Sequence, residues 1–138
     1  MGNEMSEKKR IYLADDDYSI RDTLQHFLES AGYAARAFET GNKLLEEFKR
    51  NPCDLAILDI DMPGGDLNGF GVLKKIREIS TIPIIILTAN DSDMLYQSAL
   101  DLGGDDFFIK PTTPMNIVMR VKSMFRRIEY ERADTPKG

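Results

Sequence analysis

Four short apolar runs, each ending at a polar residue, constrain this chain more than any other feature. The runs are uninterrupted rather than alternating, and they cover residues 11–14, 55–58, 84–87 and 107–109. Strands that are apolar throughout are typical of a parallel sheet covered by helices on both faces. A less apolar run at 34–38 gives a fifth expected strand.

Amphipathic segments separate these runs. After the first run, Ile20, Leu24 and Leu28 recur at helical spacing, and Gly32 predicts where that helix ends. Thr40 predicts the cap of the next helix. Repeated strand–helix units favour parallel pairing with right-handed crossovers. The sequence therefore predicts a doubly wound α/β sandwich, in which ligands bind beyond the carboxyl ends of the strands.

Length and composition bound the other possibilities. The 138 residues fit one domain, with a flexible N-terminal extension at 1–8, a domain at 9–128, and a helix extension plus a tail or truncated linker at 129–138. No run reaches membrane-spanning length, so we expect no membrane partner. One cysteine, Cys53, suits a reducing cytoplasm, and one histidine, His26, disfavours multi-histidine metal sites. The net charge of −5 argues against bulk nucleic-acid binding.

Polar residues follow the strands at the edge where ligands are expected. Asp15 and Asp16 follow the first run, Asp59 the third, Thr88 the fourth and Lys110 the fifth. Oxygen ligands of this kind select Mg²⁺, and a carboxylate is a competent nucleophile toward phosphorus. An ammonium and a hydroxyl would stabilise phosphoryl oxygens. These residues predict magnesium-dependent phosphoryl transfer to a carboxylate.

The same strand ends resemble the receiver domain of bacterial two-component response regulators. The matching segments, in this order and spacing, are 11–16, 58–63, 86–89 and 109–111. The resemblance implies a flavodoxin-like fold of five β-α units, with strand order 2-1-3-4-5 and helices on both faces. It also implies that the chain is no enzyme in the usual sense, since it catalyses only its own phosphorylation and dephosphorylation.

The resemblance assigns a role to each polar residue. Asp59 is the phosphoacceptor. Asp15 and Asp16 hold Mg²⁺ together with Asp59 and the backbone carbonyl of Asp61. Lys110 is the phosphate partner, in a peptide bond to proline that family precedent makes cis.

Other residues are expected to switch or to tune the domain. Thr88 is the switch hydroxyl, and Phe107 is the aromatic ring whose rotamer reports the state. Asp61 and Asn90 lie where the family tunes the lifetime of the aspartyl phosphate. The loop around 64–68 is two residues longer than usual in the family.

The phosphoryl donor is expected to be another protein. His26 falls on the outer face of the first helix, so we expect a partner histidine kinase or phosphotransfer protein, or a small donor such as acetyl phosphate. Phosphorylation is expected to switch the surface formed by the fourth helix, fifth strand and fifth helix. The output is then either that of a stand-alone receiver or that of a DNA-binding regulator, with DNA contacted only by an effector domain outside this sequence.

The winged-helix transcription-factor subfamily is the resemblance favoured for that output. In that subfamily, charged residues pair across a twofold axis to form a homodimer. The corresponding residues are Asp101, Asp105, Asp106, Arg120 and Arg127. Asn116 departs from the subfamily pattern, and the basic residues alternatively form a solvated face.

A small haloacid-dehalogenase-like phosphatase is the alternative. It would use Asp59 as nucleophile, with Asp61, Thr88 and Lys110 and with the acidic pair at 105–106. Against it, the Asp-x-Asp strand is third rather than first, and Lys110 follows the acidic pair instead of preceding it.

Overall fold

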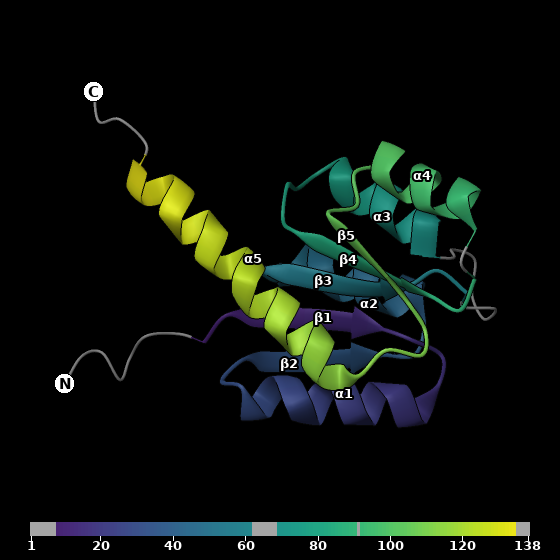
Figure 1. The fold of residues 1–138 in the computed structure, drawn as a ribbon, viewed down its shortest axis with the longest axis horizontal. Helices are drawn as coiled ribbons and strands as arrows, with labels where there is room; N and C mark the ends of the chain where they lie inside the picture. The colour runs from purple at the N-terminus through teal and green to yellow at the C-terminus, as the bar shows by residue number, and fades with distance from the viewer. Residues whose placement is uncertain (1–7, 62–68, 91, 135–138) are drawn as a thin grey trace.

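Strands and helices alternate along the chain in the computed structural model, which describes residues 8–61, 69–90 and 92–134 (Figure 1). The strands are β1 (Arg10–Ala14), β2 (Ala34–Phe38), β3 (Leu55–Asp59), β4 (Ile84–Thr88) and β5 (Asp106–Ile109). The helices are α1 (Tyr18–Ser30), α2 (Gly41–Arg50), α3 (Gly69–Arg77), α4 (Asp93–Asp101) and α5 (Pro114–Asp134). All pairings are parallel and the order is β2-β1-β3-β4-β5, which confirms the predicted fold.

The helix starts follow the local sequence signals. The Asp17 carboxylate accepts the backbone N–H of Ser19 at 2.8 Å and caps α1, while Thr40 caps α2 and Ser92 caps α4. After α1 the chain turns at Gly32, whose φ of 100° lies in the left-handed region that favours glycine. These caps fix where each helix begins relative to the strand before it.

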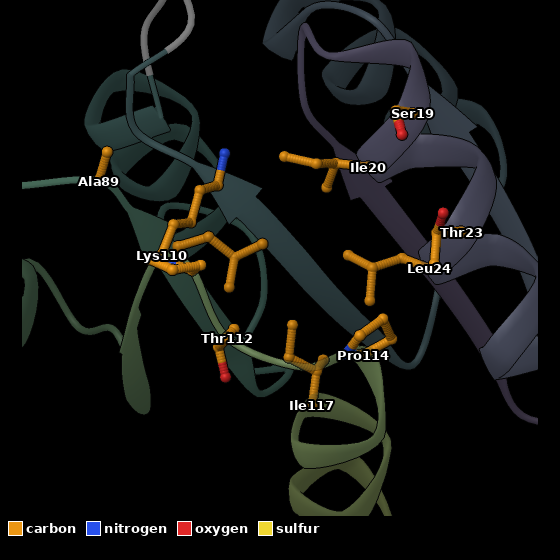
Figure 2. A pocket seen from close by; sticks show the side chains of 11 residues that line it. Ser19, Ile20, Thr23, Leu24, Ala89, Lys110, Thr112, Pro114 and Ile117 are labelled. Carbon is orange, nitrogen blue, oxygen red and sulfur yellow. The ribbon is translucent and has the colours of Figure 1, made fainter.

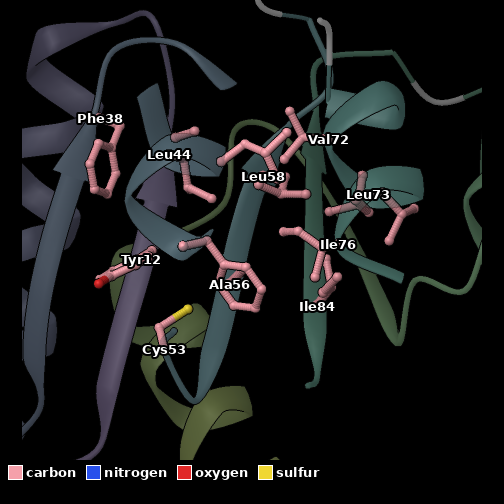
Figure 3. Close-up of a cluster of buried hydrophobic side chains, with 14 of the residues drawn as sticks. Tyr12, Phe38, Leu44, Cys53, Ala56, Leu58, Val72, Leu73, Ile76 and Ile84 are labelled. Atoms are coloured by element: carbon pink, nitrogen blue, oxygen red, sulfur yellow. The ribbon is translucent and has the colours of Figure 1, made fainter. Parts of the chain in front are cut away.

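Two apolar layers cover the sheet, one on each face. Side chains that alternate along a strand enter opposite layers: Leu58 contributes to the layer with α2 and α3, whereas Ile57 packs in the layer with α1 and α5. Figure 3 shows the first layer, with Leu44, Leu58 and Val72 between sheet and helices. Full burial of such a side chain contributes about 1.5–3 kcal/mol. Burial on both faces thus explains the uninterrupted apolar runs of β1, β3 and β4, whereas β5 is only half-buried and its Ile109 is exposed.

Helix α5 is the longest helix among the described residues. It continues without a break past Ile128 to Asp134, and it projects beyond the sheet (Figure 1). Tyr130 in this extension is exposed. Within the described ranges, no helix is both long and apolar enough to cross a membrane. Residues 1–7 of the extension predicted at 1–8, the loop insertion at 64–68, and residues 135–138 of the segment predicted at 129–138 fall outside the described residues, so these predictions stay untested.

Candidate functional site at the carboxyl edge of the sheet

Four polar side chains meet where the parallel strands end. Asp15 follows β1, Asp59 and Thr88 are the last residues of β3 and β4, and Lys110 follows β5. Asp15, Asp59 and Thr88 are each at most 1% exposed, although all three are polar. They are placed there because the carboxyl ends of parallel strands share one edge of the sheet.

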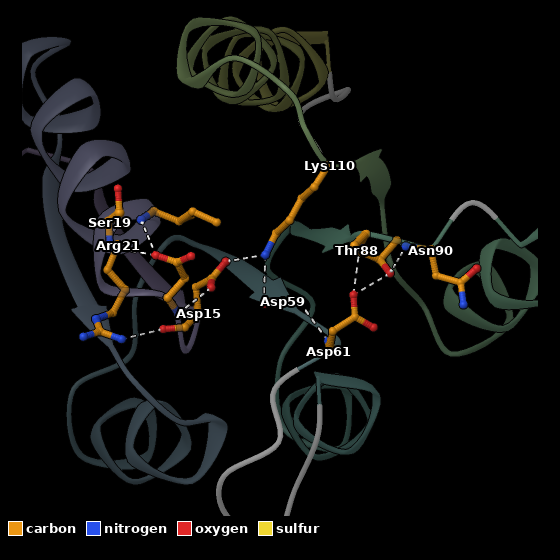
Figure 4. A network of polar contacts seen from close by, with 11 residues as sticks. Asp15, Ser19, Arg21, Asp59, Asp61, Thr88, Asn90 and Lys110 are labelled. Carbon is orange, nitrogen blue, oxygen red and sulfur yellow. Dashed lines mark hydrogen bonds and ion pairs between the residues drawn. The ribbon is translucent and has the colours of Figure 1, made fainter.

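Lys110 lies between two carboxylates (Figure 4). Its Nζ is 2.8 Å from Asp15 Oδ2 and 3.0 Å from Asp59 Oδ2. The other oxygen of each carboxylate accepts a backbone N–H, from Asp17 to Asp15 and from Asp61 to Asp59, both at 2.9 Å. Each carboxylate is therefore held in a fixed orientation by one ammonium and one amide.

Burial is the largest single influence on the pKa values of Asp15 and Lys110. It raises the pKa of Asp15 from 3.8 to about 6, and repulsion from Asp59 adds to this effect, while hydrogen bonds from Lys110 and Asp17 oppose it. Burial also opposes the charge of Lys110, but its bonds to Asp15 and Asp59 outweigh that cost and raise the pKa of the ammonium. The single ammonium of Lys110 therefore compensates two buried carboxylates, those of Asp15 and Asp59.

A third carboxylate, that of Asp16, is exposed and lies next to those of Asp15 and Asp59. Asp15, Asp16 and Asp59 can each present one oxygen so that all three oxygens lie within 4.8 Å of one another. Hard oxygen donors and excess negative charge suit a divalent cation such as Mg²⁺ or Ca²⁺. The Asp61 carboxylate lies outside this group, and the metal role expected of its backbone carbonyl stays a prediction.

The Asp61 carboxylate instead contacts the end of β4. Thr88 Oγ1 donates to Asp61 Oδ2 at 2.8 Å, and the Ala89 N–H donates to the same oxygen at 2.9 Å. The Asn90 N–H donates to Thr88 Oγ1 at 3.0 Å. The sequence analysis placed Asp61, Thr88 and Asn90 near the site but missed this link. An acid two residues beyond Asp59 was the signal that could have suggested it.

Phe107 lies in β5 against α4. Its ring is half-buried and meets the Tyr96 ring edge-on, with the centroids 5.1 Å apart and the planes at 88°. Tyr96 is itself 47% exposed and was not singled out from the sequence. The Lys110–Pro111 peptide is cis, as predicted. The pair of rings lines the surface between α4 and β5.

Gly69, at the start of α3, fits closely against the end of β3. A Cβ there would lie 2.6 Å from the Ile60 Cα and 2.7 Å from the Asp59 carbonyl oxygen. Only glycine permits this approach, so the first turn of α3 packs directly against the backbone of Asp59 and Ile60.

A cavity of about 470 Å³ opens beside Lys110, between α1 and the start of α5 (Figure 2). Ile20, Leu24 and Ile117 form part of its apolar lining. His26 lies elsewhere, on the outer face of α1, with a side chain that is 72% exposed and 3.5 Å from Asp22. On the side that faces α1, Lys110 therefore borders a cavity lined largely by apolar side chains.

The acidic residues expected at a dimer face have partners within the chain. Asp105 Oδ2 lies 2.7 Å from Arg77 Nη2, and Asp106 Oδ2 lies 2.9 Å from Arg120 Nε. Asp101 accepts a hydrogen bond from Gln97, and Arg127 is exposed. A polar groove of about 350 Å³ is lined in part by Asp105, Asp106, Arg120 and Arg127. Their role in dimerisation stays a prediction.

The placement of Asp105 and Asp106 contradicts the phosphatase alternative. Both lie at the start of β5, and Asp105 accepts the N–H of Ile84, the first residue of β4. In a parallel sheet this is the edge opposite Asp59. The acidic pair assigned to that alternative, Asp105 and Asp106, therefore lies away from Asp59.

Comparisons with known proteins give the family. The family model for the response regulator receiver domain matches residues 11–122. The regulatory protein VanRc of Enterococcus gallinarum is 36% identical over 91% of this chain and 52% of its own length. The transcriptional regulatory protein ResD of Bacillus subtilis is 35% identical over 96% of this chain and 56% of its own.

A solved structure agrees with these matches. A CheY-like response regulator receiver domain protein from Methanospirillum hungatei superposes with a TM-score of 0.83, at 28% identity, over 91% of this chain and 99% of that one. The present chain spans about half the length of the two curated relatives. The sequence, the sheet order and the family match agree, and the chain belongs to the response regulator receiver domain family.

Proposed function

We propose that this chain accepts a phosphoryl group on Asp59 from a partner histidine kinase or phosphotransfer protein. The observation that carries the proposal is the position of Lys110, whose ammonium contacts both Asp15 and Asp59 at the edge where β4 presents Thr88. This set supplies a nucleophile, a cation for phosphoryl oxygens and a hydroxyl donor. The Asp61 N–H and the Lys110 ammonium hold the two oxygens of Asp59 in a fixed orientation, which favours in-line attack once Lys110 turns toward the phosphoryl group.

Asp15, Asp16 and Asp59 would hold Mg²⁺ at this edge. The bound cation would neutralise charge on the transferring phosphoryl group. Lys110 would then keep its bond to Asp15 while turning its remaining donors toward the new phosphoryl oxygens. The domain would act only on itself, in forming and hydrolysing its aspartyl phosphate, and Asp61 and Asn90 would tune the second step.

The output would pass through Thr88 and Phe107. A phosphoryl group on Asp59 would attract the Thr88 hydroxyl, and the Phe107 ring would fill the space that Thr88 leaves. Because Phe107 contacts Tyr96, the change would reach the surface of α4, β5 and α5. Such a domain would occupy residues 9–128 and work in the cytoplasm, with α5 leading into a tail or linker.

Two outputs are compatible with this surface: a stand-alone receiver, or a regulator whose DNA-binding domain lies outside this chain. The transcriptional regulator ResD is similar over about half its length, which favours the second. Exposed Met94 and Leu100 on α4, with Arg127 on α5, would contribute to a homodimer. Sizing the chain with and without beryllofluoride, a phosphoryl mimic, tests this, and a monomer in both states would argue against the dimer.

Replacing Asp59 tests the proposed function directly. We expect acetyl phosphate and Mg²⁺ to add one phosphoryl group to the unaltered chain and none to Asp59→Asn, as measured by intact-protein mass spectrometry. Asp54→Asn is the matched control. Asp54 lies directly before β3, at the end of the strand opposite Asp59, and its carboxylate accepts the Arg10 N–H. Undiminished labelling of Asp59→Asn would refute the assignment, and repeated turnover of a phosphate ester would indicate an enzyme instead.

A further inference from the structure

The hydroxyl proton of Thr88 already has an acceptor. A hydroxyl carries one proton and two lone pairs. In Thr88 the proton goes to Asp61 Oδ2 at 2.8 Å, and a lone pair accepts the Asn90 N–H at 3.0 Å (Figure 4). The hydroxyl cannot donate to a phosphoryl oxygen on Asp59 without first giving up the bond to Asp61.

Asp61 is well placed to compete for this proton. Its side chain is a carboxylate, and hydrogen bonds to carboxylates are shorter and stronger than those between neutral groups. The same oxygen also accepts the Ala89 N–H at 2.9 Å, so Asp61 connects the end of β3 to the first residue after β4. The Asp61 N–H, in turn, donates to Asp59 Oδ1. One residue therefore contacts both the phosphoacceptor and the hydroxyl.

We propose that the Asp61 side chain is a positioning residue that restrains the Thr88 hydroxyl and so opposes the switch until Asp59 is phosphorylated. This inference rests on the proposed function. The restraint lowers the population of the switched state, and the phosphoryl group must supply the free energy that breaks it. Loss of Asp61 lets Thr88 move without that cost.

The expected effect is a gain in affinity for the phosphoryl mimic. We expect Asp61→Ala to bind beryllofluoride in the presence of Mg²⁺ roughly tenfold more tightly than the unaltered chain, because the bond from Thr88 to Asp61 no longer has to be broken; tenfold corresponds to about 1.4 kcal/mol. Asp61→Asn retains an acceptor oxygen without the charge and is expected to fall between the two. Binding is measured by the change in Tyr96 and Phe107 ring resonances in NMR spectra.

A double-mutant cycle separates the restraint from a simple charge effect. Removing a negative charge beside Asp59 would favour an anion whether or not Thr88 is present. The restraint acts only through the Thr88 hydroxyl, so Asp61→Ala should gain much less in a Thr88→Ala background. An equal gain in both backgrounds would overturn the proposal.

Amide exchange gives a readout that needs neither metal nor phosphoryl mimic. In the unaltered chain, the Ala89 N–H is bonded to Asp61 and the Asn90 N–H to Thr88. Asp61→Ala should speed exchange at both amides, since Thr88 then leaves its position. Thr88→Ala should speed exchange at Asn90 and leave Ala89 protected. An unchanged Asn90 rate in Asp61→Ala, in a chain that circular dichroism shows to be folded, would mean that Thr88 is not restrained by Asp61.

The two proposals fail in different ways. If the unaltered chain is not phosphorylated on Asp59, the proposed function is wrong, and the amide rates alone decide whether Asp61 restrains Thr88. If the chain is phosphorylated but the cycle shows no coupling between Asp61 and Thr88, only the restraint is wrong.

Discussion

Charged groups lie at both edges of the sheet, and the two edges are built differently. At the carboxyl edge, Lys110 is the one cationic side chain of the described residues in contact with Asp15 and Asp59, and the exposed Asp16 adds a third carboxylate. At the amino edge, one guanidinium, that of Arg77, meets one carboxylate, that of Asp105. The first cluster carries excess negative charge, whereas the second is balanced.

The amino-edge pair also satisfies the backbone around it. Arg77 Nε donates to the Gly103 carbonyl at 3.0 Å, and Asp105 Oδ2 accepts the Ile84 N–H at 2.8 Å. These bonds join the end of α3 to the starts of β4 and β5. The pair therefore stabilises the fold and leaves no charge for a ligand to neutralise.

The carboxyl edge retains a cost that a cation would remove. A buried carboxylate beside another carboxylate is destabilising unless positive charge compensates both. The contrast indicates that an unbalanced buried cluster belongs to ligand binding and a balanced one to structure. The free energy of unfolding tests this interpretation. At the carboxyl edge, removing an acid should raise it and removing the base should lower it. At the amino edge, either removal should lower it.

Removal of Lys110 should have the largest effect. Lys110→Met leaves Asp15 and Asp59 without their cation, so we expect the free energy of unfolding without metal to fall by about 2–3 kcal/mol. Added Mg²⁺ should recover part of the loss, because the cation takes over the compensation. Urea denaturation with and without Mg²⁺ measures both. A loss that Mg²⁺ leaves unchanged would contradict a cation-binding role for this edge.

Removal of Asp15 should have the opposite sign. Its pKa of about 6 in the folded chain lies above the ordinary 3.8, so the folded state binds this proton more tightly. The cost of the buried charge is absent below the ordinary pKa, grows as pH rises, and is complete above the folded pKa. Asp15→Asn should therefore stabilise the metal-free chain by about 2 kcal/mol near pH 8.

The gain from Asp15→Asn should shrink as pH falls through the folded pKa of Asp15, and Mg²⁺ should no longer stabilise the variant. Thermal unfolding near about pH 8 and about pH 5 measures this dependence. Glu46→Gln, which neutralises an exposed acid on α2, is the control and should change little at either pH. A destabilised Asp15→Asn at the higher pH would show that the edge is balanced after all.

At the amino edge, both single changes should destabilise by a smaller amount. Asp105 is 44% exposed at its side chain, so solvent screening discounts the pair, and we expect Arg77→Met and Asp105→Asn each to cost about 1–1.5 kcal/mol. Mg²⁺ should alter neither value. Lys74→Met, on an exposed position of the same helix, is the matched control for Arg77→Met. A stabilised Asp105→Asn would remove the contrast between the two edges.

The sheet was predictable because the three central strands, β1, β3 and β4, are buried on both faces. The apolar run that contains Ile57 and Leu58 predicted a buried strand without tertiary information, and the residue type of Thr40 was enough to predict a helix start. The convergence of Asp15, Asp59, Thr88 and Lys110 then followed from parallel pairing.

Side-chain partners were not predictable in the same way. Asp61 lies two positions from Asp59 in the sequence, yet its carboxylate contacts Thr88, 27 positions along the chain. Asp105 was expected at a dimer face but contacts Arg77, 28 positions away. The direction of an individual carboxylate depends on backbone geometry that no local signal encodes.

The sequence by itself therefore determined which residues end which strands, and with that the fold and the chemistry available at one edge. The tertiary structure decided which of these groups contact one another. Lys110 contacts both Asp15 and Asp59, and the Thr88 hydroxyl donates its proton to Asp61. The physical reason is that apolar burial and helix capping are set by local patterns. Hydrogen bonds between strand ends depend instead on distances of a few tenths of an ångström, which only the packed sheet fixes.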